Sequence, residues 1–351
     1  MNLCALLLSH ASGYHFHNPG LIVGVMLLIG VIPFVGYAIV GIRSLRMARM
    51  LAWLLTIASV ASVERLLIDE PAGLRMVLII VALLWAMKAV VGVESLNRKP
   101  SLPLGNWLAF VLLWFGMRPK LFMKFSNQPR TDWGTYVLRG VNRIGLGVAL
   151  IAIAIFLVFE WIGKDSSVVP FWRLWVATAF LMPGLSLLMH FGLFNLLVGF
   201  WRRFSINCTP LFRAPLLSTS LTEFWGKRWN LAFSEMTAVS VFRPIKARLR
   251  NSEIGVHVAT ASAFLFSGLL HELAISVPVQ AGFGLPLLYF LLHGIGMVAE
   301  NMFDRFGIEI LNRPWIGSLW TWAWVMIPIP ILFHRPFLEG CVWPLIGIGV
   351  R

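Results

Sequence analysis

The chain has 351 residues, of which 58% are hydrophobic and only 13% are charged, and its mean hydropathy is +0.81. Soluble domains are roughly 45–50% apolar and about 25% charged, so a soluble fold could not hide this much apolar surface from water. The composition excludes a water-soluble enzyme, a disordered chain and a disulfide scaffold, and it predicts an all-α polytopic membrane protein. The net charge of +14 then indicates basic loops beside anionic headgroups rather than nucleic-acid binding.

Eight stretches are long and apolar enough to cross about 30 Å of hydrocarbon as helices. They are residues 20–41, 50–66, 74–93, 144–163, 172–200, 255–279, 285–303 and 315–333. Two shorter stretches, 104–117 and 337–350, are expected to be re-entrant or interfacial, which sets ten spans as the upper bound. The long stretch 172–200 contains Pro183-Gly184, so a broken helix is expected there, because proline removes a backbone donor.

Basic residues concentrate in the segments 41–50, 118–143 and 201–254, whereas the loop after residue 66 is acidic. The positive-inside rule places these three segments in the cytosol and the loops after residues 66 and 163 outside. Because segment 201–254 mixes bases with aromatic and aliphatic residues, we expect interfacial amphipathic helices there, with an ordinary cytosolic loop as the alternative. We expect one membrane domain over residues 1–351, no cleaved signal peptide, and a location in a bacterial inner membrane, with the endoplasmic reticulum as the alternative.

Polar and ionisable residues inside apolar stretches are costly, so each is a functional candidate. They are Lys88, Glu160, His190, His257, His271, Glu272, His293, Glu300 and Asn301. Lys88 and Glu160 lie near the ends of spans, where a structural role is expected. His271 follows the small pair Ser267-Gly268 by one turn and is a candidate general base, with a helix-packing hydrogen bond as the alternative.

Patterns for metal and nucleotide binding are missing from the sequence. Position 275 is Ile275, so the zinc pattern of two histidines at i and i+4 on one helix is not met. The three cysteines are widely spaced, and no phosphate-binding glycine loop occurs. We therefore expect no bound metal.

A second group of candidate residues is the run LTEFWGKRWN at residues 221–230. Its dense aromatics beside Lys227-Arg228 suit the membrane surface, where the bases could also hold phosphates of an anionic cofactor. Asn230 at its end can donate or accept a hydrogen bond in an active site. The alternative for Asn230 is a helix cap or a turn residue.

Three motifs together resemble the wax-ester synthase-like branch of the membrane-bound O-acyltransferase superfamily. They are SLTEFWGKRWN at 220–230, SGLLHE at 267–272 and WFGMRP at 114–119, where Phe115 stands in place of the usual proline. The order and spacing of the motifs make the resemblance specific, and it extends over residues 106–300. It implies roughly eight to eleven membrane helices around an intramembrane tunnel.

The resemblance also implies an acyl-CoA-dependent O-acyltransferase whose acceptor is a lipophilic alcohol and which has no permanently bound cofactor. His271 would be its catalytic histidine, acting as general base, and Asn230 its conserved polar residue on the cytosolic side. The expected substrate-binding residues are Trp225, Lys227, Arg228, Trp229, Ser267 and Glu272. Two alternatives remain: a transporter or lipid flippase that uses the same intramembrane polar residues, and a helical scaffold without activity.

Overall fold

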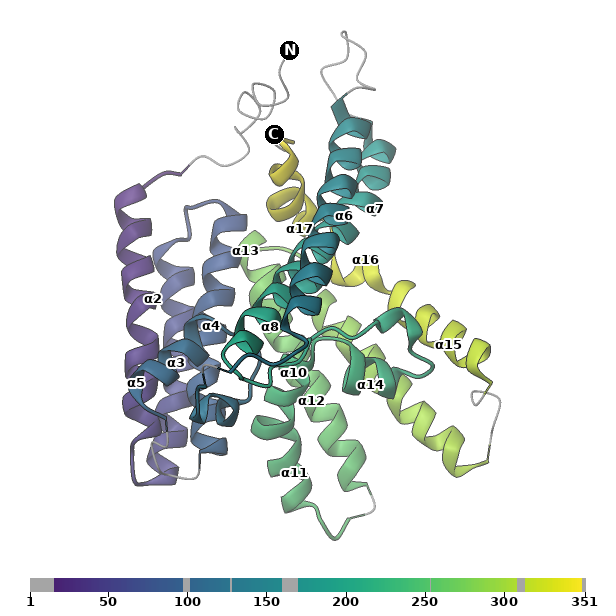
Figure 1. Cartoon of the computed structure of the whole chain (residues 1–351). Coiled ribbons are helices and arrows are strands. Elements are labelled where there is room, and N and C mark those ends of the chain that lie inside the picture. The colour runs from purple at the N-terminus through teal and green to yellow at the C-terminus, as the bar shows by residue number, and fades with distance from the viewer. Residues whose placement is uncertain are drawn as a thin grey trace. The chain divides into compact units, whose positions relative to one another are not determined.

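The computed structural model describes residues 16–96, 102–126, 128–159, 170–252, 254–307 and 313–348, and every regular element in these ranges is a helix (Figure 1). Within them, eight helices are long and apolar enough to cross a membrane. They are α2 (Pro19–Val40), α3 (Leu45–Leu66), α4 (Ala72–Ser95), α6 (Trp133–Phe159), Phe171–Arg203, Gly255–Val279, α14 (Leu285–Arg305) and Pro314–Leu332. The prediction of a multi-pass all-α membrane protein is confirmed. The sidedness and the bacterial location stay predictions, and Glu160 lies outside the described residues.

Helix α6 begins at Trp133, well before the expected residue 144. Hydropathy marks only the apolar part of a helix, whereas the helix itself can continue through arginines, which are good helix formers. Arg139 lies over the ring of Tyr136, with 5.7 Å between the guanidinium carbon and the ring centroid. Two of the basic residues assigned to a loop, Arg139 and Arg143, therefore belong to the first three turns of this helix.

The expected break at Pro183 is wrong. Pro183 lies inside α7 (Phe171–Ser186), which continues through a π-helix, η3 (Leu187–Leu193), into α8 (Phe194–Arg203). Proline removes one backbone donor, and the wider π turn that follows absorbs the disturbance without ending the helix.

The chain divides into two compact units. The unit Leu121–Arg213 is an antiparallel hairpin in which α6 packs against α7, η3 and α8. Glycines permit the close approach: a Cβ built on Gly147 would lie 2.8 Å from the carbonyl oxygen of Gly184, and one on Gly192 would lie 2.5 Å from Ile144. Small residues at membrane helix interfaces allow backbones to come this close.

We expect Gly147→Val to destabilise this hairpin by about 1–3 kcal/mol, because the new side chain would collide with the backbone of α7. Gly145→Val on the same helix is the matched control, since nothing lies within 4 Å of a Cβ built there. Thermal unfolding in detergent measures both variants. Equal melting temperatures for the two variants would show that the glycine contact does not hold the hairpin together.

The other unit comprises the described residues of Met1–Lys120 and Ala214–Arg351. In it α2, α3 and α4 lie side by side (Figure 1). The short helix α5 (Leu104–Leu112) docks on them through Trp107, whose indole donates to the carbonyl of Pro33 at 2.8 Å. Fully buried Lys88 donates to the carbonyls of Phe110, Trp114 and Gly116. Lys88 thus has a structural role at the end of α5, where a cation complements the helix dipole.

Helices α12 (Gly255–His271) and α14 also lie side by side (Figure 1). Gly268 permits this contact, because a Cβ there would lie 2.6 Å from Leu287. The α12 segment continues through a π-helix, η7 (Glu272–Ser276), into α13 (Val277–Val279). The last helical span consists of α15 (Pro314–Met326) and α16 (Ile329–Leu332). The described part of the expected short stretch, residues 337–348, contains only brief turns after α17 (Arg335–Phe337): η9 (Leu338–Val342) and η10 (Trp343–Ile346).

Candidate active site

The motif at residues 220–230 folds into a short helix, α9 (Leu221–Glu223), and a π-helical turn, η5 (Phe224–Arg228). Ser220 caps α9 by accepting from the backbone N–H of Glu223 at 3.0 Å. Buried Glu300 of α14 accepts from the backbone N–H groups of Leu221 at 2.6 Å and Thr222 at 3.0 Å. A carboxylate at a helix N-terminus satisfies donors that have no partner within the helix. Glu300 therefore anchors the motif to a membrane helix.

Asn230 connects this motif to α10 (Leu231–Thr237) and has a left-handed backbone with φ 40° and ψ 62°. Asparagine tolerates this conformation better than most residues. Its side-chain oxygen accepts from the backbone N–H of Phe233 at 3.3 Å, so Asn230 is the N-cap of α10. The cap engages the carbonyl oxygen of the amide, and the amide NH2 forms no hydrogen bond within the described chain.

His271 is the last residue of α12. Its ring nitrogen Nδ1 lies 2.7 Å from the carbonyl oxygen of Ser267, and because a carbonyl can only accept, Nδ1 carries the proton. The neutral ring then has its lone pair on Nε2. The imidazole lies between two phenyl rings, with centroids 4.1 Å from Phe290 and 5.3 Å from Phe233. These rings fix its orientation.

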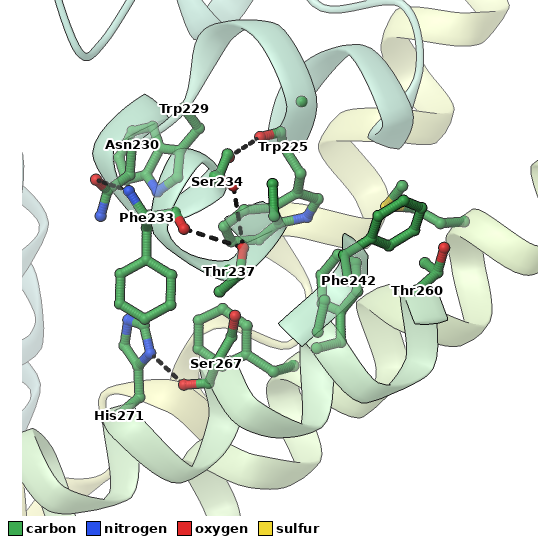
Figure 2. A pocket seen from close by; sticks show the side chains of 16 residues that line it. Trp225, Trp229, Asn230, Phe233, Ser234, Thr237, Phe242, Thr260, Ser267 and His271 are labelled. Atoms are coloured by element: carbon green, nitrogen blue, oxygen red, sulfur yellow. Dashed lines mark hydrogen bonds between the residues drawn. The ribbon is translucent and has the colours of Figure 1, made fainter. Parts of the chain in front are cut away.

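A cavity of about 220 Å³ brings together residues from both motifs (Figure 2). Helix α12 supplies one wall, α10 and the π-helix η6 (Ala238–Phe242) another, and α14 closes it with Phe290 and Met297. Of the eight expected site residues, five line it: Trp225, Trp229, Asn230, Ser267 and His271. In Figure 2 the ring of Phe233 lies between Asn230 and His271, so these two residues share the cavity without a direct contact.

The other three expected site residues do not line this cavity. Lys227 is exposed. Arg228 forms an ion pair with Glu223, 2.8 Å between nitrogen and oxygen, and also donates to the carbonyl of Ala214. The backbone N–H of Thr219 lowers the pKa of the Glu223 carboxyl against the opposing effect of burial, and Arg228 lowers it further, so this pair is charged at neutral pH. Arg228 is thus already neutralised by a neighbour.

Glu272 points away from His271, toward the N-terminus of α14. One of its oxygens accepts from the backbone N–H groups of Gly284 at 2.9 Å and Leu287 at 3.0 Å. Successive helical residues diverge by about 100°, which explains why neighbours in sequence serve different surfaces.

Sequence reasoning did not identify Phe233 and Phe290 as site residues. Both are ordinary hydrophobic residues in apolar surroundings, and only the packing of α10 and α14 on α12 brings them to the imidazole. It also did not identify the connection between the upstream motif and the site. Arg118 pairs with Glu235 of α10 at 2.6 Å, a contact across more than one hundred residues of sequence.

The remaining polar candidates lie outside the cavity. His190 contacts Ser186 within its own helix, with 3.1 Å between Nδ1 and the hydroxyl. Fully buried His293 bonds through Nδ1 to the carbonyl of Tyr289, and Asn301 donates to that of Met297. His257 lies in the first turn of α12. Within the described residues, no cluster of three or more His, Cys, Asp or Glu side chains could hold a metal ion.

Residues 208–292 match the model of a family described as the membrane bound O-acyl transferase family. The matched segment contains every cavity-lining residue except Met297. This segment belongs to the membrane bound O-acyl transferase family. The resemblance carried by the two motifs at 220–230 and 267–272 is thereby confirmed.

Three curated relatives are similar to this part of the chain. Probable long-chain-alcohol O-fatty-acyltransferase 7 of Arabidopsis thaliana is 37% identical over 95 residues, 26% of this chain and 28% of the relative. Probable long-chain-alcohol O-fatty-acyltransferase 6 of the same plant is 35% identical over 113 residues, which cover 31% of this chain and 33% of the relative. The long-chain-alcohol O-fatty-acyltransferase of Simmondsia chinensis is 32% identical over 107 residues, which cover 28% of this chain and 30% of the relative. The chain thus aligns with about a third or less of each relative, and the similarity supports the wax-ester synthase-like branch.

Proposed function

We propose that the protein transfers an acyl group from acyl-CoA to the hydroxyl of a lipophilic alcohol in the cavity beside His271. One observation carries the proposal: the bond from Nδ1 to the Ser267 carbonyl leaves Nε2 as a proton acceptor in a cavity that Asn230 also lines. An imidazole whose tautomer is fixed in this way presents a defined lone pair and is suited to general base catalysis. The similarity to long-chain-alcohol O-fatty-acyltransferases supports the reaction type.

In the proposed reaction, His271 Nε2 accepts the proton of the acceptor hydroxyl while the alcohol oxygen attacks the thioester carbonyl carbon. The carbon–sulfur bond then breaks, and the coenzyme A thiolate takes the proton back from the imidazolium. The Ser267 carbonyl stabilises the imidazolium through Nδ1–H. The amide NH2 of Asn230 is available to donate to the substrate, and the aromatic walls exclude the water that would hydrolyse the thioester.

The cavity also suggests how the donor lies. Along α12 its lining runs from His271 through Ser267 and Ala263 to Thr260, about 16 Å of helix rise. Beyond Phe242 at the end of η6 the chain continues directly into α11 (Arg243–Arg248). The exposed bases of this region are Arg243, Lys246, Arg248 and Arg250. We place the acyl thioester at His271, the pantetheine arm along α12 and the phosphates at these bases, which the positive-inside rule puts in the cytosol.

Charge reversal on α11 tests the donor site. We expect the double variant Arg243→Glu/Lys246→Glu to raise the KM for acyl-CoA about tenfold or more at low salt, with a small change in kcat, because two phosphate contacts become repulsive. Arg46→Glu in the first turn of α3 is the control, since this base is exposed but remote in sequence from the cavity-lining elements. An unchanged KM for the double variant would place the phosphates elsewhere.

The acceptor is proposed to be a long-chain alcohol, from the names of the relatives. The test is an acyl-transfer assay with purified protein in detergent, labelled palmitoyl-CoA or acetyl-CoA, and a panel of fatty alcohols, sterols and diacylglycerol. Ester and free coenzyme A formed in equal amounts support the proposal. Binding of acyl-CoA without transfer to any acceptor would favour the transporter alternative, which the similarity to acyltransferases does not favour.

A further inference from the structure

The N-terminus of α14 is held by a side chain from another helix. Gly284, the residue before this helix, has no side chain with which to cap it. Glu272 supplies the cap, because its Oε1 accepts from the N–H groups of Gly284 and Leu287. These donors would otherwise lack partners within α14. The carboxylate therefore ties the end of α12 to the first turn of α14.

This tie lies beside the rings that hold His271. Phe290, one turn after Leu287, packs on the imidazole with 4.1 Å between centroids. On the preceding turn of α12, Gly268 packs directly against Leu287. The Glu272 cap and the Gly268 contact thus fix the first two turns of α14 against α12, and with them the position of Phe290.

We propose that Glu272 is a positioning residue, which sets the orientation of His271 for acyl transfer by holding α14, and Phe290 with it, against α12. The inference rests on the proposed function. It replaces the sequence-based expectation that Glu272 binds substrate, and it is supported by the absence of Glu272 from the cavity lining.

The charge of Glu272 is not what the proposed role requires. The charge of Glu272 acts on a titratable neighbour, His334. The Nε2 atom of His334 lies 3.3 Å from the hydroxyl oxygen of Ser276. Burial lowers the pKa of His334, and the carboxylate opposes this shift only in part, so the ring is neutral at pH 7. The second carboxylate oxygen of Glu272 has no hydrogen-bond partner within the described chain. A neutral amide at this position can therefore still accept both N–H groups of α14.

The test compares Glu272→Ala with Glu272→Gln in the full-length protein. We expect Glu272→Ala to lower kcat at least about tenfold while changing the KM of either substrate less than threefold, since small misplacements of a catalytic group are costly. Glu272→Gln should restore most of the kcat, with the same dependence on pH as the wild type. Glu70→Ala is the matched control: Glu70 is buried and caps α2 through the N–H groups of His17 and Asn18, remote in sequence from the site.

A second measurement reports the geometry without activity. With 4-fluorophenylalanine at position 290, the fluorine resonance reports the packing on His271. We expect Glu272→Ala to shift or broaden it, and Glu272→Gln and Glu70→Ala to leave it in place. A kcat loss in Glu272→Ala with an unmoved resonance, or a KM increase as large as the kcat loss, would overturn the positioning role. If the wild-type protein showed no acyl transfer, the proposed function would be overturned instead. The fluorine resonance alone would then decide whether Glu272 holds the rings of Phe290 and His271 together.

Discussion

His271→Ala is expected to lower ester formation by about 10²–10⁴-fold, the usual contribution of a positioned general base. The variant removes the only proton acceptor that the proposed mechanism uses, whereas the cavity walls formed by Phe233 and Phe290 remain. Because the ring is held by its own helix through Ser267 and by contact with the two tilted phenyl rings, its loss leaves the helix ends intact. Ester formation from labelled acyl-CoA measures the effect, alongside thermal unfolding of the same preparation.

His257→Ala is the matched control for this experiment. His257 lies on the same helix, fourteen residues earlier, and does not line the cavity. We expect the acyl-transfer rate of the His257→Ala protein to stay within about threefold of the wild-type rate, because His257 takes no part in the proton transfer. A His271→Ala protein that retains full transfer would remove His271 from the mechanism.

Removing the amide NH2 group of Asn230 is expected to have the second-largest effect, a loss of about 10²-fold in kcat. Losing one hydrogen-bond donor to a reacting oxygen typically lowers kcat by about 10²–10³-fold. The structure separates this role from capping. Asn230→Asp keeps the capping acceptor but loses the NH2 group, and aspartate also tolerates the left-handed backbone. Asn230→Gly keeps the backbone and weakens the cap by only a few tenths of a kcal/mol. Steady-state kinetics of both folded variants measure the donor role.

Asn230→Ala serves as the structural comparison. It loses the cap, about 1 kcal/mol, and also strains the backbone at φ 40°, so we expect a lower melting temperature than for the other two variants. If Asn230→Asp and Asn230→Gly both kept wild-type kcat, Asn230 would be a helix cap alone, the alternative that the sequence left open.

The membrane spans could be predicted from sequence because hydropathy is a local property. The stretches 255–279 and 285–303 agree closely with the helices Gly255–Val279 and Leu285–Arg305. Helix starts in basic segments were missed, as at Trp133, since helix formation does not require apolar residues. The continuation past Pro183 was missed because a π turn has no signal of its own in composition.

The site was predictable only in part. The resemblance carried by the motifs identified Asn230 and His271, which do line one cavity. The partners that orient them depend on contacts between distant segments: Phe290 on the imidazole, Glu300 at the start of α9 and Glu272 at the start of α14. No local pattern reveals such contacts, because a buried carboxylate that caps a helix has the same sequence appearance as one that binds a substrate.

The most direct test is a structure of the protein with a non-transferable acyl-CoA analogue in which a methylene replaces the thioester sulfur. We expect the acyl carbonyl in the cavity near His271 Nε2, with room for one alcohol oxygen between them, and the phosphates beside the bases of α11. Analogue bound with its carbonyl outside this cavity, or with His271 facing away from it, would contradict the proposed site of acyl transfer.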